Sequence, residues 1–266
     1  MKKYRKNTLT IAGSDCSGGA GIQADLKSFS ANGTYGMSVI TAITAQNTMG
    51  VFAVENLNEE IIRGQIEAVF EDIEVHGVKI GMVSEEKIIK AIGEGLKKYR
   101  PTKIVLDPVM ISKSGFSLLK PGAKDALREV LIPLAYLVTP NVPEAEELTG
   151  IKINSVEEMI EAGKKILNFG PKYVLIKGGH LDGEAIDILL GENMIREYKS
   201  ERLNRNNTHG TGCTLSSAIT SNLALGYGIE EAVQRGKDYI TEAIRNSFPL
   251  GKGVGPVNHF YKIEEE

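Results

Sequence analysis

The sequence predicts an α/β protein, a three-layer α/β/α sandwich in which helices cover both faces of a mostly parallel central sheet. Short apolar or β-branched runs alternate with amphipathic helical runs along nearly the whole chain. Glycine and proline punctuate the boundaries, and no linker, repeat or low-complexity segment interrupts the alternation. Residues 1–266 are therefore interpreted as one domain that begins with a basic extension (1–7) and ends in an acidic tail (263–266).

The first half of the chain is expected to supply three strands and three helices. Apolar and β-branched runs favour the strands, and amphipathic spacing with a glycine stop at Gly33 favours the first helix. The expected strands are 9–13, 37–46 and 77–82, and the expected helices are 21–33, 59–72 and 85–99.

The second half continues the alternation and then changes. A hairpin around Gly191-Glu192-Asn193 is expected to add an antiparallel edge to the sheet, and parallel neighbours should be joined by right-handed connections. A closed barrel is the rival architecture, but it would need eight regular strand–helix units, which the pattern does not provide. The expected strands are 103–110, 135–141, 173–179, 185–190 and 194–199, and the expected helices are 121–131, 143–149, 155–169, 211–226 and 230–247.

Composition and charge exclude several classes of protein. Thirty-one basic and 34 acidic residues give a net charge of −3, which argues against a nucleic-acid-binding surface. The longest apolar run, "VLIPLAYLV", has nine residues and contains a proline, so it cannot span a bilayer. Two cysteines far apart, Cys16 and Cys213, suggest no disulfide framework and are consistent with a reducing cytoplasm.

Polar residues and glycines gather where the expected strands end. In open α/β sheets, ligands bind beyond the carboxyl ends of the strands. Because several such ends carry chemistry, we expect them to form one site. They are "GSDCSGGAG", Gln46-Asn47-Thr48, Gly81-Met82, Asp107-Pro108-Val109, Asn141 with Glu144, and Lys177-Gly178-Gly179.

Two glycine-rich turns are candidates for binding an anion. "GSDCSGGAG" lacks the ending of a Walker motif and the Rossmann spacing, so a tight turn and a phosphate loop both remain open. "HGTGCT" opens the 211–226 helix, where converging N–H groups and the helix dipole favour an anion. The alternative is plain capping by Thr208 or Thr211. Cys213 stands in the first turn, and a helix N-terminus lowers a thiol pKa, which predicts a reactive thiol.

Three charged residues have two interpretations each. Asp107, between an apolar strand and Pro108, is either near a metal or phosphate-bound water or a turn cap. Glu144 is either an outer-shell Mg²⁺ ligand or a favourable contact with a helix dipole. Lys177 either reaches a nucleotide phosphate or is an edge lysine. The histidines His76, His180, His209 and His259 have no metal-ligand spacing, and no catalytic role is expected for them.

Several of these segments together resemble one family. "LTIAGSDCSGGAGIQADLKSFSANGTYGMSVITAITAQNT", "KIGM", "LDPVM", "TPNVPEAEEL", "IKGGH" and "NTHGTGCTLSSAI" are similar to hydroxymethylpyrimidine/phosphomethylpyrimidine kinases of thiamine biosynthesis, within the ribokinase-like superfamily. The resemblance runs in order from about residue 8 to "GPVNHF", over nearly the whole chain. It implies ATP and Mg²⁺, a homodimer, and a small-molecule pyrimidine that is phosphorylated twice, from alcohol to monophosphate to diphosphate.

The resemblance also implies roles for individual residues. Gln46 would hold the pyrimidine, because one amide offers both a donor and an acceptor to an aminopyrimidine edge, and Met82 would pack on the ring. The matching positions are Gln46, Gly13, Asp25, Met82 and Val109 for the pyrimidine; Asn141, Lys177, Thr208 and Gly212 for the nucleotide; Asp107 and Glu144 for the metal; and Gly210, Thr211, Gly212 and Cys213 for the catalytic anion hole.

One departure from the family, one contrast with related sugar kinases and two alternatives accompany this resemblance. Related sugar kinases carry aspartate where Cys213 stands, and an uncharged thiol would not repel a phosphorylated acceptor. Cys16 stands where the pyrimidine kinase family often has serine or proline. Pyridoxal kinases share the framework, although "AQNT" at 45–48 is similar to the pyrimidine kinases. A non-catalytic vitamin-binding regulator on the same fold is the second alternative, which the intact Asp107, Glu144 and Lys177 disfavour.

Overall fold

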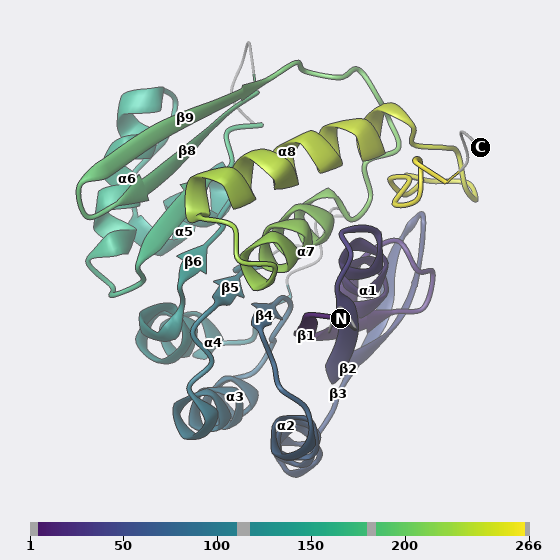
Figure 1. Cartoon of the computed structure of the whole chain (residues 1–266), viewed down its shortest axis with the longest axis vertical. Helices are drawn as coiled ribbons and strands as arrows, with labels where there is room; N and C mark the ends of the chain where they lie inside the picture. The colour runs from purple at the N-terminus through teal and green to yellow at the C-terminus, as the bar shows by residue number, and fades with distance from the viewer. Residues whose placement is uncertain (1–4, 111–117, 180–184, 264–266) are drawn as a thin grey trace.

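The computed structural model describes residues 5–110, 118–179 and 185–263. Within them, nine strands form one sheet in the order β3-β2-β1-β4-β5-β6-β7-β8-β9 (Figure 1). This confirms the predicted α/β class. Most of the predicted N-terminal extension (residues 1–4), most of the acidic tail (264–266) and His180 lie outside the described residues. The single-domain interpretation stays a prediction, which the membership of all these strands in one sheet supports.

Six strands form the parallel centre of the sheet, and antiparallel strands lie at both edges. The chain runs from β1 to β2 on one side and then crosses to β4 on the other, so β1 and β4 flank a topological switch point. The strands are β1 (Asn7–Asp15), β2 (Tyr35–Asn47), β3 (Gly50–Asn56), β4 (Gly77–Ile80), β5 (Ile104–Leu106), β6 (Leu137–Val138), β7 (Tyr173–Ile176), β8 (Ala185–Gly191) and β9 (Met194–Ser200).

Helices cover both faces of this sheet, as Figure 1 shows. Successive strand residues point to opposite faces, and the two faces have separate cores. On β5, for example, Leu106 packs with residues of α2, α3, α5 and α6, whereas Val105 packs with residues of α7 and α8. The helices are α1 (Gly21–Ala31), α2 (Glu59–Asp72), α3 (Glu86–Tyr99), α4 (Ala123–Ala126), α5 (Val142–Thr149), α6 (Val156–Leu167), α7 (Thr211–Ala224) and α8 (Ile229–Arg245).

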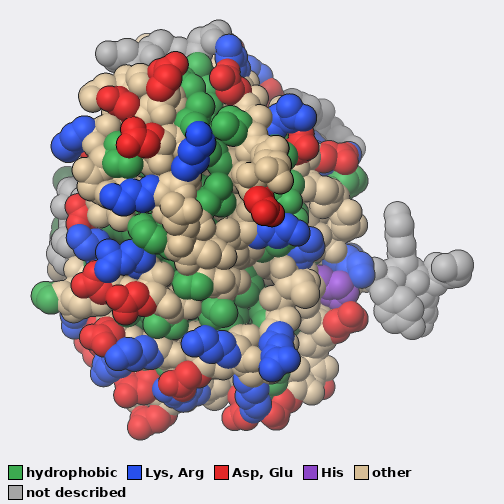
Figure 2. All heavy atoms as spheres, turned by 90° about the vertical axis from the view of Figure 1, so that its left-hand side faces the viewer, with side chains coloured by type: hydrophobic (Ala, Val, Ile, Leu, Met, Phe, Trp, Pro, Cys, Tyr) green, Lys and Arg blue, Asp and Glu red, His purple; other side chains and the backbone are tan. Residues whose placement is uncertain are grey.

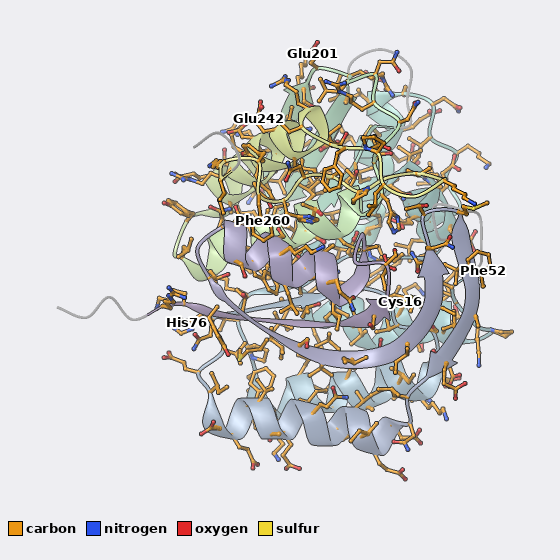
Figure 3. The ribbon with its side chains drawn as sticks, turned by 90° about the vertical axis from the view of Figure 1, so that its right-hand side faces the viewer. Cys16, Phe52, His76, Glu201, Glu242 and Phe260 are labelled. Atoms are coloured by element: carbon orange, nitrogen blue, oxygen red, sulfur yellow. The ribbon has the colours of Figure 1, made fainter. Side chains whose placement is uncertain are left out.

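Two parts of the sequence-based assignment were wrong. Strand β3 was missed because none of its residues is buried, so it lacks the apolar alternation that marks a strand; Phe52 is 67% exposed on this outer strand (Figure 3). The expected helix 121–131 is instead a short α-helix followed by a π-helical turn (Leu127–Leu131) and a 3₁₀ turn (Ile132–Leu134). Pro133 has no N–H to donate, so the regular helix cannot continue through it.

Surface charge is mixed rather than segregated. Figure 2 shows acidic and basic side chains interspersed over one face of the molecule, with apolar side chains scattered between them. No helix in the described part of the chain is long and apolar enough to cross a membrane.

Candidate active site

A cavity of about 1310 Å³ opens where the parallel strands end. Typical single-ligand pockets have volumes of roughly 300–1,000 Å³, so this one can hold a nucleotide beside a small acceptor. All the predicted site residues line it except Asp25. They are Gly13, Gln46, Met82, Asp107, Val109, Asn141, Glu144, Lys177, Thr208, Gly210, Thr211, Gly212 and Cys213.

Asp25 is sealed in the protein rather than open to the cavity. Its Oδ2 accepts hydrogen bonds from Thr10 Oγ1 (2.6 Å) and Lys79 Nζ (2.9 Å), and its Oδ1 accepts from Ser217 Oγ (2.7 Å). Both Asp25 and Lys79 are 0% exposed. In this structure Asp25 binds Lys79, which lines the cavity, and does not line it itself. Its contact with the pyrimidine stays a prediction.

Asp107 and Lys177 form a second ion pair, and this one faces the cavity. Lys177 Nζ lies 2.8 Å from Asp107 Oδ1, which also accepts from Thr139 Oγ1 at 3.1 Å. Burial alone would raise the pKa of Asp107, but Lys177 and Lys79 outweigh it and hold that pKa below its usual value. A Cβ at Gly212 would lie 3.5 Å from Asp107 Oδ2, so the first turn of α7 adjoins the pair.

Glu144 belongs to a capping box at the start of α5. Its Oε2 accepts from the backbone N–H of Asn141 at 2.8 Å, while Asn141 Oδ1 accepts from the backbone N–H of Glu144 at 2.9 Å. Burial raises the pKa of Glu144 to about 7, against the opposing effect of Lys177. A cation at this wall would favour the ionised carboxylate, so the pKa and the predicted metal role are compatible.

The entrance of α7 has the features of an anion site. Gly210 is the N-cap with φ 80°, and a Cβ there would overlap the carbonyl oxygen of Gly19, so glycine is required for this close approach. Having no side chain, Gly210 offers no capping oxygen to the first-turn N–H groups. The Thr211 hydroxyl donates to the carbonyl oxygen of Thr208 at 2.8 Å. This arrangement favours the anion interpretation over plain capping.

Cys213 is half-buried in the same turn, where the sequence predicts a reactive thiol. Burial raises its pKa to about 11, although the Lys79 ammonium acts in the opposite direction. A pKa this high keeps the thiol neutral near pH 7, which argues against the predicted reactivity. The sequence showed the helix start but not the burial or the nearby carboxylates of Asp25 and Asp107.

The other end of the cavity has neutral polar groups and an apolar wall. Gly13 and Met82 are in close contact, since a Cβ at Gly13 would overlap the Met82 methyl group. The Gln46 side chain lies beyond them, with its amide between Thr44 Oγ1 (3.3 Å) and His209 Nε2 (3.2 Å). An amide beside an apolar wall suits a small heteroaromatic ring.

Asp15 and His209 are cavity residues that sequence reasoning missed. His209 Nε2 lies 3.0 Å from Asp15 Oδ2, and Asp15 also accepts from the Ser17 and Ala20 backbone N–H groups. These hydrogen bonds overcome the effect of burial and lower the pKa of Asp15 to about 2. The available signal was position: Asp15 lies in the first glycine-rich turn, and His209 directly precedes Gly210.

Among the described residues, His76, His259 and Cys16 have local structural roles. His76 Nδ1 accepts from the backbone N–H of Asn7, and buried His259 pairs with Thr214 Oγ1. Cys16 lies just after β1 (Figure 3), where its thiol donates to the Gln46 carbonyl oxygen at 3.1 Å and accepts from the Gln46 N–H at 3.4 Å. Cys16 thus holds the main chain of Gln46 without lining the cavity.

The fold and cavity define a phosphotransferase of the ribokinase-like class, with an ion pair and a helix N-terminus at one end and an acceptor site at the other. Residues 15–258 match the phosphomethylpyrimidine kinase family. The chain belongs to this family.

Individual relatives agree with that assignment. A hydroxymethylpyrimidine/phosphomethylpyrimidine kinase of Rhizobium meliloti is 50% identical over 96% of this chain and 97% of its own length. The thiamine biosynthesis bifunctional protein of Geobacter sulfurreducens is also 50% identical, but the chain spans only 54% of its length.

Two solved structures represent the two activities found on this fold. A phosphomethylpyrimidine kinase from Clostridium difficile 630 is 68% identical with a TM-score of 0.83, covering 90% of this chain and 100% of that one. An ADP complex of Bacillus subtilis pyridoxal kinase is 41% identical with a TM-score of 0.90, covering 96% and 98%. The backbone alone therefore does not separate the two activities, and residues of the acceptor site must do so.

Proposed function

We propose that this protein transfers the γ-phosphoryl group of ATP to 4-amino-5-hydroxymethyl-2-methylpyrimidine, and then a second phosphoryl group to the resulting monophosphate. The observation that carries this proposal is the shared cavity, which joins the Gln46 amide to the Asp107–Lys177 pair and the start of α7. Relatives named for both phosphorylations match nearly the whole chain, which supports the same substrate class.

In the first step, the hydroxymethyl oxygen bonds to the γ-phosphorus, the bond between the γ-phosphorus and the bridging oxygen of ADP breaks, and the alcohol proton passes to solvent water. Positioning and charge stabilisation dominate such reactions. We assign the first-turn N–H groups of α7 and the Lys177 ammonium to the charge on the transferring group. A neutral Cys213 thiol is not a preformed base. Its contribution is that a small, uncharged side chain accommodates both the alcohol and the charged monophosphate.

ATP is the proposed phosphoryl donor, and Mg²⁺ is its proposed partner. The ADP-bound pyridoxal kinase relative supports nucleotide binding on this fold. No group of three or more His, Cys, Asp or Glu side chains in the described ranges could hold a metal by itself. Mg²⁺ commonly takes one or two carboxylates plus phosphate oxygens and water, and the cavity-lining carboxyls of Asp107 and Glu144 fit that pattern. Bound there, Mg²⁺ would neutralise charge on the phosphates.

The assembly and location of the protein stay predictions. The resemblance implies a homodimer, and the cysteine usage favours a cytoplasmic location. The mixed charge of the face in Figure 2 offers no concentrated basic surface for a nucleic acid.

A product assay tests the proposed function. The pyrimidine alcohol, its monophosphate and pyridoxal are incubated separately with ATP and Mg²⁺, and the phosphorylated products are quantified by mass spectrometry. We expect both pyrimidine compounds to be phosphorylated with a higher kcat/KM than pyridoxal. Faster phosphorylation of pyridoxal would instead assign the pyridoxal kinase activity, and no acceptor-dependent product at all would favour a regulator.

A further inference from the structure

The Asp15–His209 pair has no assigned role, yet it touches Gln46, whose amide is proposed to pair with the acceptor ring. His209 Nε2 lies 3.0 Å from Asp15 Oδ2 and 3.2 Å from the Gln46 amide nitrogen. Its ring packs directly on the main chain, since a Cβ at Gly19 would overlap it. The side chains of His209 and Asp15 are only 13% and 3% exposed, so this contact is a built part of the cavity wall.

The charge on Asp15 determines which way His209 Nε2 hydrogen-bonds. Asp15 accepts four hydrogen bonds from this neighbourhood, including those of Ser17 and Ala20, and an ionised carboxylate can only accept. His209 Nε2 must therefore carry a proton and donate it to Asp15. A bare Nε2 would place its lone pair against a carboxylate 3.0 Å away, which is repulsive.

The proton on His209 Nε2 determines which end of the Gln46 amide faces the histidine. A protonated Nε2 repels the NH₂ group of Gln46, because two donors would meet. The amide oxygen therefore faces His209, where it shares the Nε2 proton with Asp15. The two ends of an amide exchange by a half-turn and are assigned by their hydrogen-bond partners. At the other end, the single Thr44 hydroxyl proton is used by the Ser14 carbonyl oxygen at 2.9 Å, so Thr44 Oγ1 can accept from the amide NH₂.

We propose that the Asp15–His209 pair fixes the polarity of the Gln46 amide and thereby the orientation of the acceptor ring. With its oxygen toward His209 and its nitrogen toward Thr44, the amide retains one lone pair and one N–H for a ligand. This inference rests on the proposed function. An aminopyrimidine pairs with that edge in one sense only: its 4-amino group lies on the His209 side and its ring nitrogen on the Thr44 side.

This orientation is also the productive one. The reacting 5-hydroxymethyl group is next to the 4-amino group on the ring, so it too lies on the His209 side. His209 directly precedes Gly210, the N-cap of α7. The reverse amide polarity would pair the ring turned over, with the hydroxymethyl group directed away from α7. His209 and Asp15 are thus positioning residues that determine specificity without reacting.

The decisive substrate is the 4-oxo analogue of the pyrimidine alcohol. It presents an acceptor and a ring N–H donor, the reverse of the 4-amino edge. The wild-type protein should prefer the 4-amino compound, and His209→Phe, which keeps the ring shape but frees the amide to rotate, should lower the ratio of the two kcat/KM values by roughly tenfold or more. His209→Gln, whose amide can donate near the same place, should retain most of the preference.

A control variant and a spectroscopic measurement complete the test. His76→Phe, at a histidine outside the cavity lining, should leave the ratio unchanged. ¹⁵N NMR of the ligand-free protein, assigned by comparison with His209→Phe, should show a protonated Nε2. An unprotonated Nε2, or an unchanged ratio in His209→Phe, would overturn the inference. If the wild type phosphorylates neither pyrimidine, the proposed function fails, while the NMR result still decides the state of His209.

Discussion

Two of the lysine–aspartate pairs beside the cavity, Lys79–Asp25 and Lys177–Asp107, differ in their access to it. Lys79 and Asp25 are 2.9 Å apart and fully buried, and Asp25 has both oxygens engaged by protein. Lys177 and Asp107 are 2.8 Å apart, but the lysine side chain is 15% exposed and both residues line the cavity. A lysine–aspartate pair that is shut off from the cavity therefore stabilises the interior, whereas one that lines the cavity is available to bind a ligand.

The largest expected effect separates the two pairs by stability. Lys79→Met leaves the Asp25 carboxylate buried without its cation, which should cost about 3–5 kcal/mol in the free energy of unfolding. Lys177→Met should cost less, because the Asp107 carboxylate keeps its hydrogen bond from Thr139 Oγ1 and the nearby charge of Lys79, while it abolishes most phosphoryl transfer. Urea denaturation followed by circular dichroism measures both free energies.

The double variant Lys79→Met/Asp25→Leu is the matched control for that comparison. Replacing both members of a buried pair by apolar residues is often close to neutral, so most of the lost stability should return. Equal destabilisation by Lys79→Met and Lys177→Met would show that the distinction between a closed and an open pair is wrong.

The comparison also explains how far the sequence could lead. The strand ends predicted the cavity because parallel strands end at one edge, and Asp107, Glu144 and Lys177 all proved to line it. The sequence could not show that Asp107 lines the cavity and Asp25 does not, because Asp25 is paired with Lys79, 54 positions away along the chain. A spacing pattern does not contain such a contact.

The same limit applies to other features that depend on contacts between distant parts of the chain. His209 has no motif spacing, and its importance arises from its contact with Asp15, 194 positions away. The pKa of Cys213 depends on burial that only packing reveals. Strand β3 has no buried residue, and its pairing with β2 is what makes it a strand. Sequence patterns therefore predicted the elements and the place of the site, whereas packing determined the electrostatics.

Glu144 provides a smaller test on the open side of the cavity. Burial raises its folded-state pKa to about 7, above the ordinary value of 4.5. A raised pKa contributes stability that is fully present below about pH 4.5 and is lost as the pH rises through 7. We expect Glu144→Gln to remove this loss, so that the stability difference between the two proteins changes by on the order of 2–3 kcal/mol across the interval.

The measurement is urea denaturation of the ligand-free wild type and Glu144→Gln at several pH values between 4.5 and 8. Glutamine also suits the capping box at the start of α5, so the variant should keep the helix start intact. Parallel stability curves for the two proteins would show that Glu144 does not titrate in this range.

The smallest expected effect concerns Cys213. Charged groups of both ion pairs, Lys79 and Asp25 of the buried pair and Asp107 of the open pair, affect the pKa of its thiol. The neutral thiol places no charge beside the acceptor, whereas Cys213→Asp would add a carboxylate. The alcohol substrate is uncharged, but its monophosphate has a second pKa of about 6 and is a dianion at pH 7.5. Two like charges 4 Å apart repel by about 4 kcal/mol at an effective dielectric constant of 20, and neighbouring lysines will offset part of this. Cys213→Asp should therefore lower kcat/KM for the monophosphate at least about tenfold more than for the alcohol.

Cys213→Ser is the neutral control and should keep the ratio of the two values close to that of the wild type. An equal loss for both acceptors in Cys213→Asp would contradict the charge argument and leave the size and packing of the thiol as its contribution.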